Sequence, residues 1–229
     1  MRFYLNPSNQ PGNFYCMGGT NERENMTLIA NLTADALRRC GQEVRVGSTM
    51  EGGVKESNAW PADVHVPMHS NASKYGTARG ARVFYGRAKD KAQIVWAHLD
   101  AVIGGDHVPP SKASLYEINN TNCDTIYIEA AFHDNPTDCK LLLENREEIA
   151  EAICQGLCEA CGIKYVAPAA DPVALAGNVE QPSEWAKEAM QWAVDNGLIQ
   201  GDSNGLRPHD FVTRQELALI LYRLKAMLH

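Results

Sequence analysis

Two hydrophobic patterns alternate along the first two thirds of the chain. Short runs of β-branched and aromatic residues, typical of strands, are separated by longer segments whose apolar residues recur every three or four positions, as in an amphipathic helix. The predicted strands cover residues 2–5, 43–46, 64–68, 81–85 and 125–128, and the predicted helices cover 22–40, 89–102 and 141–161. Strands that alternate with helices indicate an α/β fold, with a mostly parallel sheet flanked by helices.

A different pattern begins near residue 164. The segment from Val166 to Pro182 is rich in Pro and Ala and has no periodicity, which is typical of a linker. Two predicted helices follow at 185–196 and 213–228, and Gly197 ends the first. We therefore predict three parts: a domain over 1–163, a linker over 164–182 and a small helical module over 183–229.

Two of the predicted strands lead directly into chemically active side chains. The run 125–128 leads into Glu129, with His133 on the loop beyond, and the run 64–68 leads into His69. A carboxylate at the end of a buried strand is costly unless its charge is used. Open α/β sheets place their chemistry at the carboxyl ends of their strands. Together these residues indicate a metal-dependent hydrolase.

A further acid stands at the start of the first helix. Asn21 and Glu24 have capping-box spacing, which gives Glu24 a structural task and leaves Glu22 free to point back towards the strand ends. The alternative role for Glu22 is a favourable interaction with the helix dipole.

Charge and cysteine content narrow the choice of partner and compartment. The net charge of −7 argues against nucleic acid or an anionic membrane as the main partner. No apolar run is long enough to span a membrane, and residues 1–5 form a strand rather than a signal peptide. The seven cysteines have irregular spacing, so we expect reduced, packed thiols. Zinc binding by Cys154, Cys158 and Cys161 is the less favoured alternative, because they share one helix and lack a second cysteine or histidine pair.

Three separated motifs resemble the zinc-dependent N-acetylmuramoyl-L-alanine amidases of bacteria and phages. They are Glu22 with its helix, the segment 69–72 and the segment 128–136, and the resemblance covers roughly residues 1–163. It implies a six-stranded sheet and a Zn²⁺ cofactor, with Glu22 and His69 as zinc ligands and Glu129 as the catalytic carboxylate. The implied reaction is hydrolysis of the amide bond between N-acetylmuramic acid and L-alanine of the stem peptide.

The chain departs from the family pattern at one metal ligand. The family usually carries a histidine just after its first strand, whereas residues 6–10 here contain none. Asn9 or Gln10 would fall near the metal, although amide oxygens are weaker zinc ligands than imidazole. We expect His133 to be the third ligand and Gln10 to orient a ligand or the substrate, and the choice between His133 and the Asn9/Gln10 loop stays open. The polar loop after His69 makes Asn71 a candidate for substrate contact.

The end of the chain, over residues 184–217, resembles a single S-layer homology repeat. Such repeats bind bacterial cell-wall polymers, usually in sets of three. Arg214 is the candidate contact with an acidic polymer, and self-association into a homo-oligomer could rebuild a surface made of several repeats.

These features predict an enzyme that degrades peptidoglycan and carries a wall-targeting module. Without an export signal, it would be made in the cytoplasm and released to the wall like a phage lysin, or be extracellular by another route. Two alternatives are a catalytically impaired wall-binding protein with the same fold and a different zinc peptidase, such as a carboxypeptidase, on a related sheet.

Overall fold

The computed structural model describes residues 1–168, 182–183, 186–200, 206, 212 and 214–227. The chain divides into two compact units between Pro168 and Ala169, and each is described by itself. Most of the predicted linker and of the turn between the last two helices, with Trp185, Pro208 and Thr213, lies outside the described residues.

The first unit is built on a six-stranded sheet in the order β2-β1-β3-β6-β4-β5. The strands are β1 (Arg2–Pro7), β2 (Glu43–Val46), β3 (Val64–Asn71), β4 (Arg82–Tyr85), β5 (Ser111–Lys112) and β6 (Asp124–Phe132). The neighbours among β2, β1, β3 and β6 pair in parallel, whereas β4 pairs antiparallel with β6. This arrangement confirms the predicted fold class.

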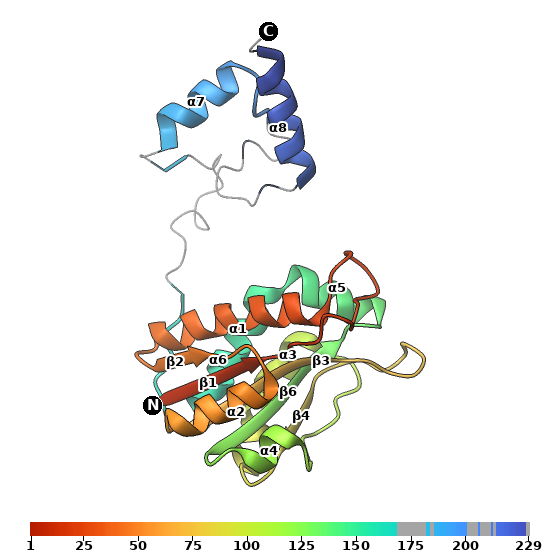
Figure 1. Ribbon diagram of the computed structural model, residues 1–229, viewed down its shortest axis with the longest axis vertical. Helices are drawn as coiled ribbons and strands as arrows, with labels where there is room; N and C mark the ends of the chain where they lie inside the picture. The colour runs from red at the N-terminus through yellow and green to blue at the C-terminus, as the bar shows by residue number, and fades with distance from the viewer. Residues whose placement is uncertain (169–181, 184–185, 201–205, 207–211, 213, 228–229) are drawn as a thin grey trace. The chain divides into compact units, whose positions relative to one another are not determined.

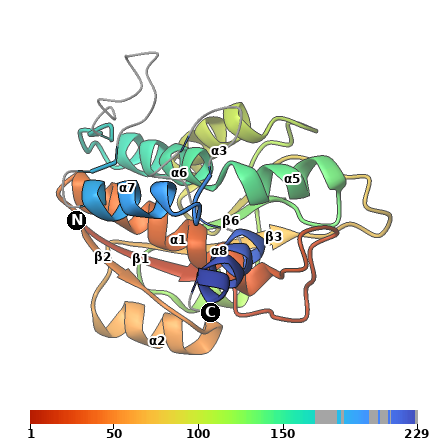
Figure 2. The ribbon, with the colours of Figure 1, turned by 90° about the horizontal axis from the view of Figure 1, so that it is seen from above.

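Helices cover both faces of the sheet (Figure 1). They are α1 (Glu22–Arg39), α2 (Met50–Ala59), α3 (Lys89–Ile103), α4 (Tyr116–Asn120), α5 (Pro136–Glu144) and α6 (Arg146–Ala160). Seen from above, α1, α6 and α3 lie side by side over one face, and α6 packs against both neighbours (Figure 2). The short helices α2 and α4 lie on the other face.

The two faces of the sheet differ in character because successive strand residues point to opposite sides. Towards α1, α3 and α6 the strands present a continuous apolar layer in the main hydrophobic core: Phe3, Leu5, Val64, Val66, Met68, Ile126 and Ile128. Towards α2 and α4 they present polar or amphipathic side chains: Tyr4, Asn6, His65, His69, Thr125, Tyr127 and Glu129. We call these the apolar face and the polar face.

The structure corrects the prediction of one long helix over 141–161. The chain forms α5 and α6 instead, and Asn145 ends the first and begins the second with a non-helical backbone. The earlier start is set by Asn135, whose side chain accepts hydrogen bonds from the backbone of Thr137 and Asp138, and by Pro136 in the first turn.

The second unit contains α7 (Lys187–Asp195) and α8 (Arg214–Met227), close to the two predicted helices. Gly197 follows α7 with φ +68°, a conformation suited to glycine at the end of a helix. The Arg223 guanidinium donates a hydrogen bond to the Leu198 carbonyl, which ties α8 to the segment after α7.

Candidate active site

His69 and Glu129 are direct neighbours on the paired strands β3 and β6. Both strands run further than predicted, to Asn71 and Phe132, so the two residues lie near the carboxyl ends of their strands rather than at the last position. The His69 ring stacks on Tyr127, with 4.9 Å between ring centroids. Pairing and stacking together hold the imidazole on the polar face beside the Glu129 carboxylate.

Glu22 reaches the same place from the start of α1. Asn21 caps the helix by accepting a hydrogen bond from the Glu24 backbone, as the predicted capping box requires. The Glu22 side chain is 1% exposed, and its Oε1 lies 3.0 Å from His69 Nδ1 and accepts a bond from the Ser70 backbone N–H. Burial alone would raise the pKa of Glu22, but bonds to His69 and Asn13 outweigh it and hold that pKa below its usual range.

The side chain of Gln10, like that of Glu22, lies next to Nδ1 of His69. Its side-chain amide lies 3.3 Å from His69 Nδ1, and Asn13 donates to its Oε1 at 3.0 Å. A rotation of the amide by 180° exchanges its nitrogen and oxygen, so Gln10 can present an oxygen at this point. Asn9, the other candidate on this loop, and Gln10 are both exposed, so the contact of Gln10 with His69 Nδ1 is what favours Gln10.

Glu129 is a half-buried acid with one unused oxygen. In the part of the chain that the structure describes, its Oε2 has no hydrogen-bond partner and no contact with solvent. Burial is the main reason that the pKa of Glu129 rises to about 7; the positive charge of His69 lowers it and the negative charge of Glu22 raises it. A carboxylate with a pKa near neutrality is suited to accept and return a proton.

Glu117, on α4, belongs to this site although it was not among the residues predicted from the sequence. Its carboxylate accepts a 2.5 Å hydrogen bond from Asn6, lies 3.1 Å from His65 Nε2, and lies 3.8 Å from His69 Nε2. Burial opposes its charge, but these partners lower the pKa of Glu117 to about 2. Burial also opposes a charged His69, yet Glu117 and Glu22 raise the pKa of that imidazole to about 9. The five-residue helix α4 has no hydrophobic periodicity, so no sequence pattern pointed to Glu117.

His133 does not join Glu22 and His69. Its Nδ1 lies 2.9 Å from Ser70 Oγ and 3.1 Å from the Ser70 carbonyl oxygen, and its ring stacks on Tyr15. Ser70 follows His69 on β3 and therefore points to the opposite side of the sheet. Because His133 is bonded to Ser70, it lies on the side of the sheet opposite to the His69 ring.

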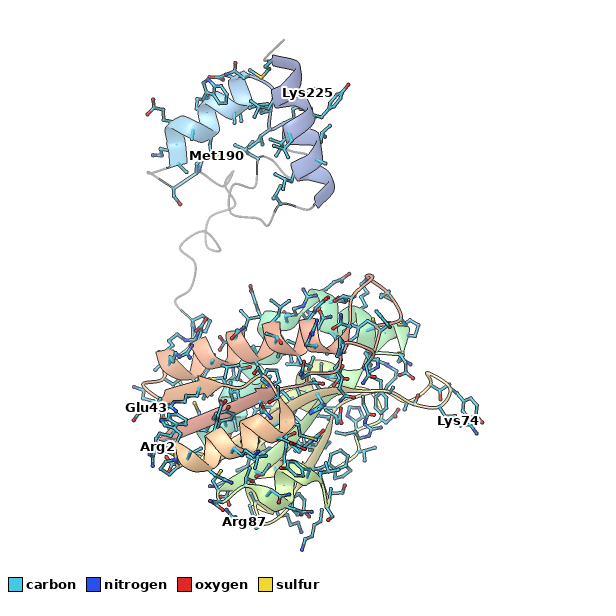
Figure 3. The ribbon with its side chains drawn as sticks, in the orientation of Figure 1. Arg2, Glu43, Lys74, Arg87, Met190 and Lys225 are labelled. Atoms are coloured by element: carbon cyan, nitrogen blue, oxygen red, sulfur yellow. The ribbon has the colours of Figure 1, made fainter. Side chains whose placement is uncertain are left out.

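The remaining predicted contacts are Asn71, for the substrate, and Arg214, for a wall polymer. Asn71 ends β3; its Oδ1 accepts a bond from the Ala72 backbone and its carbonyl accepts one from the His133 N–H. The loop beyond extends away from the sheet with Lys74 near its tip (Figure 3). Arg214 is the first residue of α8, and its side chain lies outside the described part.

The donor set on the polar face fits a divalent cation. Glu22 Oε1, His69 Nδ1 and the Gln10 amide converge, and three carboxylates, those of Glu22, Glu117 and Glu129, surround the His69 imidazole. An excess of buried negative charge is costly unless a cation offsets it. Nitrogen and oxygen donors of this kind suit zinc.

A cluster of three thiols lies elsewhere in the first unit. Within the described ranges, the only group of three His, Cys, Asp or Glu side chains with ligand atoms within 4.8 Å of one another is Cys40, Cys154 and Cys158. All three are buried in the apolar core, where Sγ atoms are 3.9 Å apart for Cys40 and Cys154 and 4.0 Å apart for Cys154 and Cys158. Cys161, the third member of the predicted helical set, is half-buried.

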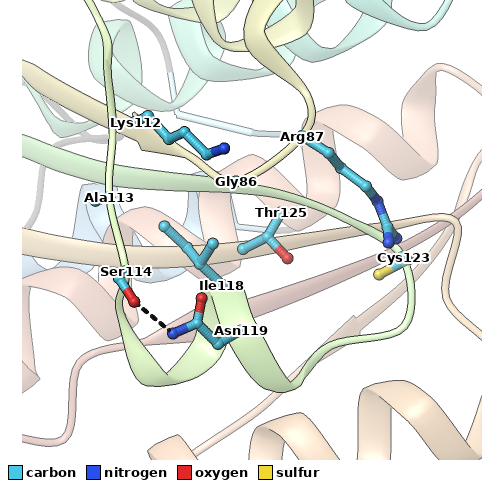
Figure 4. Close-up of a pocket in the computed structure, with 9 residues that line it drawn as sticks. All are labelled: Gly86, Arg87, Lys112, Ala113, Ser114, Ile118, Asn119, Cys123 and Thr125. Atoms are coloured by element: carbon cyan, nitrogen blue, oxygen red, sulfur yellow. Dashed lines mark hydrogen bonds between the residues drawn. The ribbon is translucent and has the colours of Figure 1, made fainter.

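A separate cavity of about 580 Å³ lies near the amino-terminal end of β6, away from the carboxyl end that carries Glu129 (Figure 4). It is lined by Arg87, Lys112, Ser114, Cys123 and Thr125, among others, and contains none of the residues around His69. The candidate active site is therefore the cluster near the carboxyl ends of β3 and β6.

Comparison with known protein families gives two matches. The sequence profile of the N-acetylmuramoyl-L-alanine amidase family (Amidase_3) matches residues 8–159, and that of the S-layer homology domain matches residues 181–218. No curated protein is similar enough in sequence to count as a match.

Solved structures of amidases share the fold of the first unit. N-acetylmuramoyl-L-alanine amidase AmiC2 of Nostoc punctiforme is similar with a TM-score of 0.66 and 19% identity, over 71% of this chain and 97% of that chain. The catalytic domain of CwlV from Bacillus (Paenibacillus) polymyxa var. colistinus has a TM-score of 0.66 and 18% identity, over 71% and 99%. An N-acetylmuramoyl-L-alanine amidase from Clostridium difficile 630 has a TM-score of 0.64 and 22% identity, over 70% and 96%.

Proposed function

The chain belongs to the N-acetylmuramoyl-L-alanine amidase family, and from this premise we propose that Glu22, His69 and Gln10 hold a zinc ion while Glu129 is the general base. The enzyme hydrolyses the amide bond between N-acetylmuramic acid and L-alanine of the stem peptide. The observation that carries the site assignment is the convergence of Glu22 Oε1 and His69 Nδ1 at 3.0 Å beside a buried oxygen of Glu129 that has no hydrogen-bond partner among the described residues.

The side chains divide the chemical work between them. When bound, zinc supplies polarisation of the scissile carbonyl and a more acidic water. Glu129 takes a proton from the attacking water, whose oxygen bonds to the carbonyl carbon, and returns that proton to the nitrogen of L-alanine as the C–N bond breaks. Asn13 donates a 2.6 Å hydrogen bond to Oε2 of Glu22 and the Ser70 backbone N–H donates a 3.2 Å bond to Oε1, which together fix the orientation of the carboxylate.

Gln10 replaces His133 in this assignment. The amide of Gln10 already lies at His69 Nδ1, whereas His133 is engaged with Ser70 and Tyr15. An amide oxygen is a weaker zinc ligand than imidazole, so we expect this protein to hold zinc less tightly than a site with a second histidine.

The second unit associates the enzyme with the cell wall through its S-layer homology sequence. We assign it the recognition of an acidic wall polymer, with Arg214 as a contact, and self-association of the module. Its helices leave large apolar side chains exposed, among them Trp192, Leu221 and Tyr222, which supports burial against another copy. Among the described residues, no helix combines the length and the apolar character needed to cross a membrane. A strictly monomeric species in light scattering would contradict self-association.

Three variants test the zinc assignment. Glu129→Gln should keep its zinc yet lose nearly all release of stem peptides with free L-alanine amines from purified cell wall. Gln10→Ala should lower zinc affinity, and His133→Ala, the matched control from the competing assignment, should leave it unchanged. Full peptide release by Glu129→Gln would remove the proposed base, and a loss of zinc only in His133→Ala would restore that residue as the ligand.

A further inference from the structure

One buried acid beside the zinc site has no part in the proposed hydrolysis. Glu117 is 2% exposed and comes from α4, far in sequence from both β1 and β3. Burying a carboxylate is expensive, and an apolar residue of similar volume would fill the space at lower cost. The partners of Glu117 therefore indicate a role beyond filling the interior.

The two ring nitrogens of His69 face two different acids. Nδ1 lies 3.0 Å from Glu22 Oε1, and Nε2 lies 3.8 Å from Glu117 Oε2. The two nitrogens point in diverging directions, so a single ion cannot bind at both. Gln10 and Glu22 both lie on the Nδ1 side, which leaves Nε2 to carry the proton of a neutral imidazole.

The structure holds Glu117 in a fixed orientation. Oε1 of Glu117 accepts a 2.5 Å hydrogen bond from the Asn6 amide and lies 3.1 Å from His65 Nε2. The other oxygen, Oε2, therefore faces His69. Asn6 itself is enclosed by Gly47 and Gly53, where any Cβ would collide with its side-chain amide. These contacts aim one carboxylate oxygen at one nitrogen.

We infer that Glu117 is a positioning residue, which accepts the Nε2 proton of His69 and so holds that ring in the tautomer that presents Nδ1 to the metal. Ligating histidines commonly donate their second N–H to a carboxylate in this way. The separation of 3.8 Å exceeds a hydrogen bond, and we expect it to shorten when the metal draws the ring into place. This inference rests on the proposed function, because it requires a metal at Nδ1.

The first test measures zinc affinity of the full chain by competition with a chromophoric chelator. Glu117→Gln removes the charge and keeps the volume, and it should raise the zinc dissociation constant about 10- to 100-fold. Glu56→Gln is the matched control, because Glu56 accepts a hydrogen bond from Tyr4 on the same face of the sheet rather than from a histidine. Equal affinities of the two variants would overturn the inference.

The second test needs no variant at position 117, so it holds even if Glu117→Gln fails to fold. Long-range ¹H–¹⁵N spectra of the zinc-loaded protein, labelled at histidine nitrogens, should show His69 with its proton on Nε2 and the metal on Nδ1. A proton on Nδ1 would overturn the inference together with the ligand set of Glu22 and Gln10, whereas equal zinc affinities of Glu117→Gln and Glu56→Gln would overturn the inference alone. A wild-type protein that takes up no zinc would overturn both the inference and the proposed function.

Discussion

The two faces of the central sheet are built from alternate residues of the same strands, yet they contribute in opposite ways. On the apolar face, Leu5, Val66 and Ile128 are fully buried in one hydrophobic core. On the polar face, their sequence neighbours Asn6 and Glu129 lie around His65 and His69, and Glu117 reaches them from α4. The apolar face stabilises the fold, whereas the polar face concentrates charge at a stability cost that the proposed zinc ion would offset.

This contrast teaches that one strand can serve stability through one face and chemistry through the other. The alternation of a β-strand separates the two tasks by a single residue, so Ile128 and Glu129 differ in role although they are adjacent. Substitutions at neighbouring positions should therefore move stability in opposite directions.

The largest effect on stability is expected at Ile128. Ile128→Ala removes a fully buried side chain and leaves a cavity in the core, which should lower the free energy of unfolding by about 2–5 kcal/mol. Urea unfolding followed by circular dichroism measures this loss. Zinc affinity of the folded variant should stay at the wild-type value, and a variant that keeps its stability but loses zinc would break the separation of the two faces.

The adjacent change, Glu129→Gln, should act with the opposite sign. Because burial raises the folded pKa of Glu129 from 4.5 to about 7, the folded protein resists ionisation and loses stability as pH rises from about 4.5 to 7. Replacing the carboxyl should therefore raise the unfolding free energy of the metal-free protein at pH 8 by about 1–3 kcal/mol, with no gain at pH 4.

The same variant should lose activity by about 10²- to 10⁴-fold, because it has no base. Denaturation at the two pH values measures the stability difference, and release of stem peptide measures the activity. A variant that is no more stable than wild type at pH 8 would show that ionised Glu129 does not lower the unfolding free energy. The contrast between the two faces would then not hold at this residue.

Titration of His69 should have a smaller effect on the stability of the metal-free protein. Its folded pKa of about 9 lies above the ordinary value of 6.5, so its contribution to stability is complete below pH 6.5 and is lost as pH rises through 9. In a Glu129→Gln background, which removes that titration, stability should fall by on the order of 1–2 kcal/mol between pH 6.5 and 9.

Zinc should abolish this fall, because the ion takes the place of the proton on Nδ1. Calorimetry with and without zinc at several pH values measures both trends. A fall of the same size with zinc present would place the metal away from His69.

The sequence was informative where local pattern decides structure. Strand 43–46 was predicted with its observed bounds, and the Asn21 cap correctly implied that Glu22 is free to turn towards the sheet. The sequence singles out Glu22, His69 and Glu129 as candidates, because each stands at the junction of a regular element with a polar segment. Their convergence in the structure follows from parallel strands that share one edge.

The sequence is least informative where tertiary structure decides. Helix α2 contains Gly52 and Gly53 and has little apolar periodicity, so it was missed although Thr49 caps it. The placement of His133 depends on which side of β3 Ser70 faces, a matter of one residue that the loop sequence does not reveal. Glu117 acts only through partners on β1 and β3, so its role requires the folded sheet.

The smallest effect is expected at Tyr4, on the part of the polar face that lies furthest from Glu129 along the strands. Tyr4 donates a 2.6 Å hydrogen bond to Glu56, and its ring stacks on His65 with 5.5 Å between centroids. Tyr4→Phe removes the bond and keeps the ring, so the unfolding free energy should fall by about 0.5–1.5 kcal/mol. Zinc affinity should not change, since the stack on His65 and the contacts of Glu117 persist. A weaker zinc affinity in Tyr4→Phe would mean that the polar face acts as one coupled network from Glu56 to Glu22, and the zinc site would then extend over the whole face.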